Sequence, residues 1–175
     1  SIGSSGDYVK EIINNFKIPF VVGDNKLKGI KMNCVLHDNI KGAEILTNHL
    51  IENDPEKKIA FIAGPKNETS SEKRLEGYKK ALLNAGIKVN ENLIKIGQWN
   101  NISGYNLTKE LFSHTDKPTS IFIGSTSMAI GVLKALQELK LKCPQDIKLV
   151  SFDYLEFVDT LEPPITILNN VEEQI

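Results

Sequence analysis

Little in this sequence of 175 residues points to disulfides, a membrane or an unusual charge. Its two cysteines, Cys34 and Cys143, lie far apart and have no CxxC-like partner, so we expect reduced residues near the core. No run approaches the roughly 20 apolar residues of a membrane span, and nothing resembles a signal peptide. These absences predict a cytoplasmic protein without a membrane partner.

The charge is nearly balanced, with 21 Lys and Arg against 22 Asp and Glu and a formal net charge of −1. Without a basic surface, this stretch is not expected to bind the phosphate backbone of DNA by itself. The hydrophobic content of 41% and the charged content of 25% are ordinary for a globular protein. A chain of this length can form a core without metals or disulfides, as one domain or as two small lobes.

Common signatures of enzymes are absent as well. The sequence has no G-x-S-x-G elbow, P-loop, HExxH motif or dinucleotide-binding glycine fingerprint. Asp38 beside His37, or the hydroxyls of residues 125–127, could be assigned catalytic roles, but the sequence places no base within reach of a nucleophile. The three histidines also lack the spacing of a metal site. We therefore expect no enzymatic activity, no metal and no cofactor.

What the sequence does contain is an alternation of short apolar runs with helical patterns. The predicted strands cover residues 33–36, 58–63, 93–97, 120–124, 148–152 and 165–168. The predicted helices between them cover residues 39–52, 69–85, 102–113 and 125–139. Such alternation favours parallel βαβ units with right-handed crossovers, which predicts an α/β fold with Rossmann-like lobes in three αβα layers.

Capping signals support the second of these helices. Thr69 and Glu72 have the spacing of a capping box, in which the side chains of the first and fourth residues satisfy each other's backbone N–H groups. Gly86 is placed to end the helix. The sequence therefore predicts that this helix begins with Thr69 as its N-cap.

The two ends of the chain suggest that one lobe is truncated. A helix at 7–16 and a strand at 18–22 have no partner strands of their own, and the weakly patterned segment 23–31 suits a linker. We interpret residues 1–32 as the C-terminal part of an N-terminal lobe with its crossover linker. Residues 33–166 then form a complete C-terminal lobe, and 167–175 form a crossover that returns to the first lobe.

Polar and aromatic side chains follow the predicted strands where each strand ends. In an open parallel sheet, ligands bind outside the carboxyl ends of the strands, because those loops face one crevice. The candidates at this edge are Asp38, Arg74, Trp99, Ser125 and Asp153. Carboxylates, a guanidinium and an indole suit a polyhydroxylated or heteroaromatic ligand.

Each candidate also has a purely structural interpretation. Asp38 and Ser125 could be helix N-caps, Asp153 an Asx-turn residue, and Trp99 a core residue. Arg74 is less easily explained, because a positive charge near a helix N-terminus opposes the helix dipole. Replacing Arg74 or Asp153 by alanine is expected to weaken ligand binding by several kcal/mol and to affect folding little.

Five further segments match a known pattern in order. They are residues 74–87, which begin with Arg-Leu-Glu-Gly-Tyr, and residues 118–122, 128–136, 144–153 and 161–166. Together they resemble the effector-binding part of LacI/GalR (lactose-repressor-like) transcription regulators. The resemblance implies a periplasmic-binding-protein-like fold with a ligand between two Rossmann-like lobes. It also implies a homodimer, and DNA binding only through a helix-turn-helix headpiece absent from this chain.

The resemblance also implies roles for particular residues. The family's effector contacts fall on Asp38, Ser70, Arg74, Trp99, Ser125, Asp153, Phe157 and Asn170. Ser125 and Thr126 depart from the family's usual Asn-Asp pair, and Asn170 replaces a frequent Gln, which leaves the identity of the ligand open. The leading hypothesis is the sensing domain of a cytoplasmic repressor that binds a small effector, expected to be a sugar. The alternative is a periplasmic sugar-binding protein of a transporter, which the start of the parent gene would distinguish.

Overall fold

The computed structural model describes residues 15, 21–23, 33–154, 160 and 165–168, which belong to two compact units. The first unit is Ser1–Asp38 and the second is Asn39–Ile175. In the first unit, strand β1 (Val21–Gly23) pairs in parallel with β2 (Asn33–Val35). The strand predicted at 33–36 is thus paired with β1, and the division between the compact units falls after Asp38. The assignment of segments to the lobes of a longer domain stays a prediction.

The second unit is built on a five-stranded parallel sheet, which confirms the predicted fold class. Its strands lie in the order β4-β3-β5-β6-β7, with β5 at the centre between β3 and β6. Their bounds are Ile59–Ala63 for β3, Ile94–Ile96 for β4, Ser120–Ile123 for β5, Lys148–Ser151 for β6 and Thr166–Ile167 for β7. Because all are parallel, their carboxyl ends share one edge, the carboxyl edge, and their first residues share the opposite amino edge.

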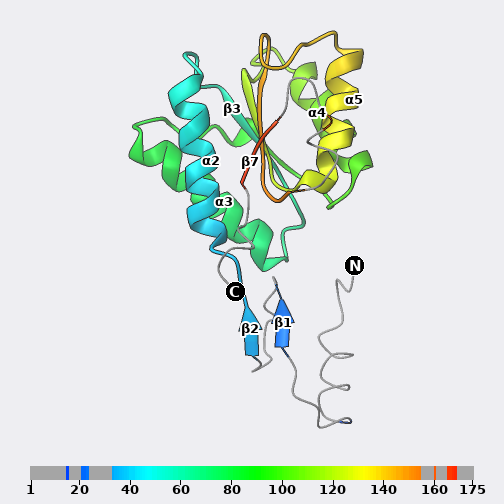
Figure 1. The fold of residues 1–175 in the computed structure, drawn as a ribbon. Coiled ribbons are helices and arrows are strands. Elements are labelled where there is room, and N and C mark those ends of the chain that lie inside the picture. Colours follow the sequence, from blue (N-terminus) through cyan, green and yellow to red (C-terminus); the bar gives the residue numbers. More distant parts are fainter. Residues whose placement is uncertain (1–14, 16–20, 24–32, 155–159, 161–164, 169–175) are drawn as a thin grey trace. The chain divides into compact units, whose positions relative to one another are not determined.

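Helices cover both faces of this sheet (Figure 1). Helices α2 (Asn39–Asn53) and α3 (Thr69–Asn84) lie on one face, and α4 (Asn101–Ser113) and α5 (Ala129–Glu138) on the other. Two short 3₁₀ helices complete the unit, η1 (Glu91–Leu93) before β4 and η2 (Thr126–Met128) before α5. None of the described helices combines the length and the apolar character needed to cross a membrane.

Alternate residues of the central strands supply the two halves of the core. Phe61 and Phe122 pack beneath α2 and α3, whereas Ile62 and Ile121 pack beneath α4 and α5. All five residues of β3 and all four of β5 are buried. A strand buried on both faces needs a continuous apolar run rather than an alternating one, and this explains the sequence pattern.

The start of α3 differs from the prediction. Its N-cap is Glu68, whose side chain makes no capping hydrogen bond, and Thr69 is already the first helical residue. The first helical bond joins the Glu72 N–H to the Glu68 carbonyl, so the prediction of Thr69 as the N-cap is wrong by one residue. The predicted end is confirmed in kind, because Gly86 adopts the left-handed φ of 70° directly after the Ala85 C-cap.

Candidate ligand-binding site

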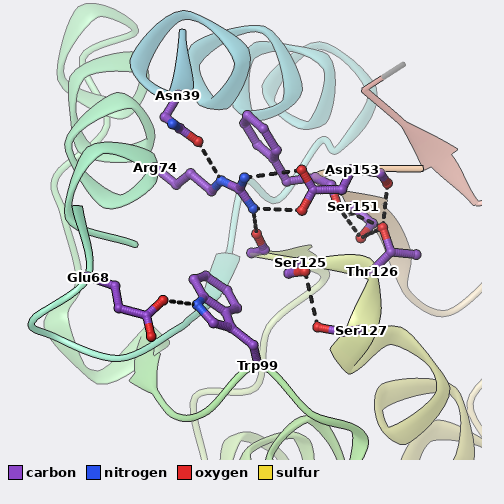
Figure 2. A network of polar contacts seen from close by, with 11 residues as sticks. Asn39, Glu68, Arg74, Trp99, Ser125, Thr126, Ser127, Ser151 and Asp153 are labelled. Carbon is purple, nitrogen blue, oxygen red and sulfur yellow. Dashed lines mark hydrogen bonds and ion pairs between the residues drawn. The ribbon is translucent and has the colours of Figure 1, made fainter. Parts of the chain in front are cut away.

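Arg74 is the centre of a polar network at the carboxyl edge of the sheet (Figure 2). Its side chain starts in the second turn of α3 and is 2% exposed. Nε donates to Asn39 Oδ1 at 2.8 Å, and Nη1 donates to the Gly124 carbonyl at 2.6 Å. Nη1 and Nη2 also donate to the two carboxylate oxygens of Asp153, at 2.8 and 3.1 Å. These four bonds use four of the five N–H groups of the guanidinium.

Aromatic rings confine the same guanidinium. Its Cζ lies 3.7 Å from the ring centroid of Phe152 and 5.7 Å from that of Trp99. A planar cation on an aromatic face is favoured by the ring quadrupole, and the planar fork fixes the position of a bidentate carboxylate. Arg74 therefore acts in this structure as the residue that positions Asp153.

Asp153 follows β6 in a turn whose backbone conformation is held by neighbouring residues. Its φ of 67° lies in the left-handed region, which Asp tolerates better than most residues. The hydroxyl of buried Thr126 donates to the Phe152 carbonyl at 2.7 Å and also to the Asp153 carbonyl, so η2 holds the turn. The Asp153 side chain is 32% exposed, and thus a buried cation holds a carboxylate that solvent still reaches.

The indole of Trp99 lies beside Arg74 and packs against the backbone of Gly64 and Gly124. A Cβ on Gly64 would come within 2.1 Å of the indole, and a Cβ on Gly124 within 3.4 Å. The ring can occupy this place because the residues that follow β3 and β5 have no side chain. Its Nε1 donates to a carboxylate oxygen of Glu68, and the indole is half-buried (Figure 2).

The two predicted serines line the same edge. Ser70 is 8% exposed and precedes Arg74 by one turn of α3. Ser125 is the N-cap of η2, as expected, but its side chain makes no capping bond. Instead, its Oγ lies 3.1 Å from Ser127 Oγ (Figure 2).

The structure thus brings several of the predicted residues to one edge. Arg74, Trp99 and Asp153 are in one network, with Ser70 and Ser125 on the adjoining helix starts. Asp38 is the last residue of the first unit, where it is exposed, and its place in a ligand site stays a prediction. Phe157 and Asn170 lie outside the described residues.

Three further residues of the network were not singled out from the sequence, namely Asn39, Glu68 and Phe152. Glu68 lies in the loop after β3, where the strand-end rule could have found it. The contact of Phe152 with Arg74 has no local sequence signal, because it depends on how β6 and α3 are placed. In the described part of the chain, no three His, Cys, Asp or Glu side chains are grouped so that they could hold a metal ion.

Comparisons with known proteins agree with this geometry. Residues 47–171 match the model of the periplasmic binding protein-like domain. The ribose operon repressor of Escherichia coli (strain K12) is 31% identical over 142 residues, which are 81% of this chain and 43% of that protein. The HTH-type transcriptional repressor PurR of Actinobacillus pleuropneumoniae is 31% identical over 165 residues, 94% of this chain and 49% of that protein.

A solved structure is similar over most of the chain. The complex of the transcriptional regulator CelR with cellobiose has a TM-score of 0.84 and 30% sequence identity, over 94% of this chain and 51% of that chain. The chain spans about half the length of the curated relatives named above. Those relatives are transcriptional repressors rather than enzymes.

Proposed function

The chain belongs to the family of periplasmic binding protein-like domains, and on this basis we propose that it is the effector-sensing part of a LacI/GalR-type transcription regulator. The effector is a small molecule, expected to be a sugar, that binds at the carboxyl edge of the five-stranded sheet. The observation that carries the proposal is the Arg74–Asp153 ion pair beside Trp99. It joins a fixed carboxylate to an aromatic face at the edge where open α/β sheets bind ligands.

The chemistry of this edge suits a hydroxylated ring. A carboxylate accepts hydrogen bonds from ligand hydroxyls, and an indole covers the apolar face of a ring. Asp153 and Trp99 are partly exposed and held by neighbours, so little side-chain entropy is lost when a ligand binds. Relatives named for the ribose operon and for cellobiose support a sugar, whereas PurR supports a purine as the second class to test.

The regulatory part of the proposal follows from the same relatives. The coupling between the two sites is reciprocal: if the ligand changes the protein's affinity for DNA by some factor, DNA changes the protein's affinity for the ligand by the same factor. DNA binding would come from a helix-turn-helix headpiece, in a cytoplasmic homodimer, and the ligand would be released unchanged rather than converted. The named relatives favour this role over that of a transport receptor of the same fold.

A ligand screen on the full-length protein tests the proposal. Thermal shift would be measured with monosaccharides, disaccharides, sugar phosphates and purines, and calorimetry would follow on each hit. A ligand at about a thousand times its dissociation constant adds about 4 kcal/mol of stability, which raises Tm by several degrees. The bound ligand should be recovered intact. A folded protein that responds to no sugar or purine would contradict the proposal.

Variants then test the site itself. Asp153→Asn keeps the shape of the side chain but removes its charge, and it should weaken binding at least about tenfold. Asp116→Asn is the matched control, since Asp116 is an exposed carboxylate that bonds Asn90 and Lys58 elsewhere on the unit. Equal affinity in both variants would remove Asp153 from the site.

A further inference from the structure

We infer that Glu68 determines which ligands this site accepts: it holds the indole of Trp99, and its charge excludes anionic ligands, so that the effector is an uncharged polyhydroxylated molecule. The inference rests on the proposed function and narrows it. It separates free sugars and polyols from sugar phosphates and sugar acids.

The Glu68 carboxylate lies beside the indole of Trp99. Glu68 is the N-cap of α3, yet its side chain makes no capping bond and instead accepts from Trp99 Nε1 through Oε2. No described residue donates to the other oxygen, Oε1. The side chain is half-buried beside the indole, and so a ligand that lies on Trp99 would meet this carboxylate at the edge of the ring (Figure 2).

The buried cation of the site, Arg74, is already neutralised by an ion pair. Arg74 gives two hydrogen bonds to Asp153 and one each to Asn39 and Gly124. A site for a phosphate or carboxylate needs N–H donors or cations that are not already paired. Arg74 has one remaining N–H, and its positive charge is balanced by Asp153.

The described basic residue in the loop before Glu68 does not offset its charge. Lys66, in the loop between β3 and Glu68, is exposed, where water screens its charge. The described charge in direct contact with the indole of Trp99 is thus the Glu68 carboxylate.

Together these features define the ligand class. A hydroxyl can donate to Glu68 Oε1, whereas a phosphate or carboxylate at this place would meet a like charge. Like charges in contact across a binding interface strongly oppose association, by roughly a hundredfold in affinity. The site should therefore bind a neutral sugar and reject its phosphorylated form.

The binding experiment compares matched pairs by calorimetry on the full-length protein. The pairs are ribose with ribose 5-phosphate, glucose with glucose 6-phosphate, and cellobiose with cellobiose 6-phosphate. We expect the neutral member to bind about a hundredfold more tightly, and Glu68→Gln to reduce this ratio at least about tenfold. Glu76→Gln, which removes an exposed carboxylate paired with Lys73 on the same helix, should leave the ratio unchanged.

The contact with Trp99 is tested separately by fluorescence, because Trp99 is the only tryptophan of the 175-residue chain. Glu68→Gln retains an oxygen that can accept from Nε1 and should keep the emission maximum. Glu68→Ala removes the acceptor and should shift it, and Glu76→Ala should not. An emission maximum that does not change in Glu68→Ala would overturn the positioning role.

The outcomes separate the two proposals. If a phosphorylated sugar binds as tightly as its neutral partner, or if Glu68→Gln leaves their ratio unchanged, the site still senses sugars but the inference about Glu68 is wrong. If neither member of any pair binds and the wider panel is silent, the sensing function itself is wrong and the inference falls with it. Preferential binding of neutral sugars that Glu68→Gln weakens supports both.

Discussion

The two edges of the five-stranded sheet each hold a carboxylate among buried polar groups, but they enclose it differently. At the carboxyl edge, Asp153 is bonded to Arg74 and keeps 32% of its side chain exposed. At the amino edge, Asp54 is 2% exposed. It accepts from Ser120 Oγ and Thr119 Oγ1, both at 2.6 Å, and from the Glu56 N–H at 3.2 Å.

The difference is between a polar network that is closed and one that solvent still reaches. The hydroxyls and the N–H around Asp54 close that network, so it ties the end of α2 to the start of β5. The network around Asp153 fixes a carboxylate but leaves part of it exposed to solvent. Buried groups satisfied on all sides stabilise a fold, whereas a site requires groups that are fixed and still accessible.

Helix α3 contributes to both edges. Arg74 reaches the carboxyl edge, and Tyr78, one turn later, donates from its hydroxyl to the Ile59 carbonyl at 2.7 Å at the amino edge. Burial, with a smaller effect of Glu91, raises the pKa of Tyr78 well above its usual value, and the phenol therefore stays a donor at physiological pH. One helix thus holds the residue that positions Asp153 and, four positions later, a residue that bonds the amino edge of the sheet.

The largest effect should come from Asp153→Ala. Removing this carboxylate leaves the buried Arg74 without its counter-charge, so we expect the free energy of unfolding to fall by about 3 kcal/mol. This differs from our expectation from the sequence, that folding would be little affected, because the burial of Arg74 was not foreseen. Urea unfolding measures the change. Asp153→Asn, which keeps one acceptor oxygen and tolerates a positive φ, should lose less, and equal losses would contradict the ion-pair explanation.

A smaller effect is expected at the amino edge from Asp54→Ala. It leaves two hydroxyls and an N–H without their acceptor, which should lower the free energy of unfolding by about 2 kcal/mol at pH 7. Ligand affinity should not change, because Asp54 lies at the other edge. If this variant weakened ligand binding as much as Asp153→Asn, the two edges would not be independent.

The same carboxylate makes a prediction about pH. Burial by itself would raise the pKa of Asp54, but the hydrogen bonds from Ser120 and Thr119 outweigh it and lower the pKa below its usual value of 3.8. A carboxyl with a lowered folded pKa stabilises the fold fully above its unfolded pKa, and this contribution is lost as the pH falls through the folded pKa. The stability difference between wild type and Asp54→Ala should therefore be constant from pH 7 to about 5 and shrink below about 4. A difference that grows on acidification would contradict this sign.

The smallest effect is expected from Tyr78→Phe. It removes one buried hydrogen bond but keeps the ring, whose centroid lies 5.2 Å from that of Phe61. The free energy of unfolding, measured in urea, should therefore fall by about 1 kcal/mol. It lies one turn from Arg74 on the same helix, and therefore it tests whether a structural change in α3 reaches the ligand site. Unchanged ligand affinity would support the independence of the two edges, and a clear loss of affinity would contradict it.

Much of the fold could be predicted because it depends on local patterns. Continuous apolar runs marked β3 and β5, and the helical stripe with Gly86 marked the extent of α3 to within a few residues. The strand-end rule then placed Arg74, Trp99 and Asp153 at one edge, since it needs only the order of strands and loops along the chain. The predicted N-cap of α3 was one residue too late. The spacing of Thr69 and Glu72 fits a capping box and so favours Thr69, whereas the structure has Glu68 as the N-cap.

What the sequence alone determined is therefore the type of each element and the edge at which its polar residues lie, since both follow from periodicity and connection. Only the tertiary structure decided the pairings: Arg74 with Asp153, 79 residues apart, and Trp99 with Glu68, 31 residues apart. Those contacts depend on which strands are neighbours in the sheet and how closely α3 packs on it, which no local pattern records. The burial of Arg74 and its place as the residue that positions Asp153 were decided at that level.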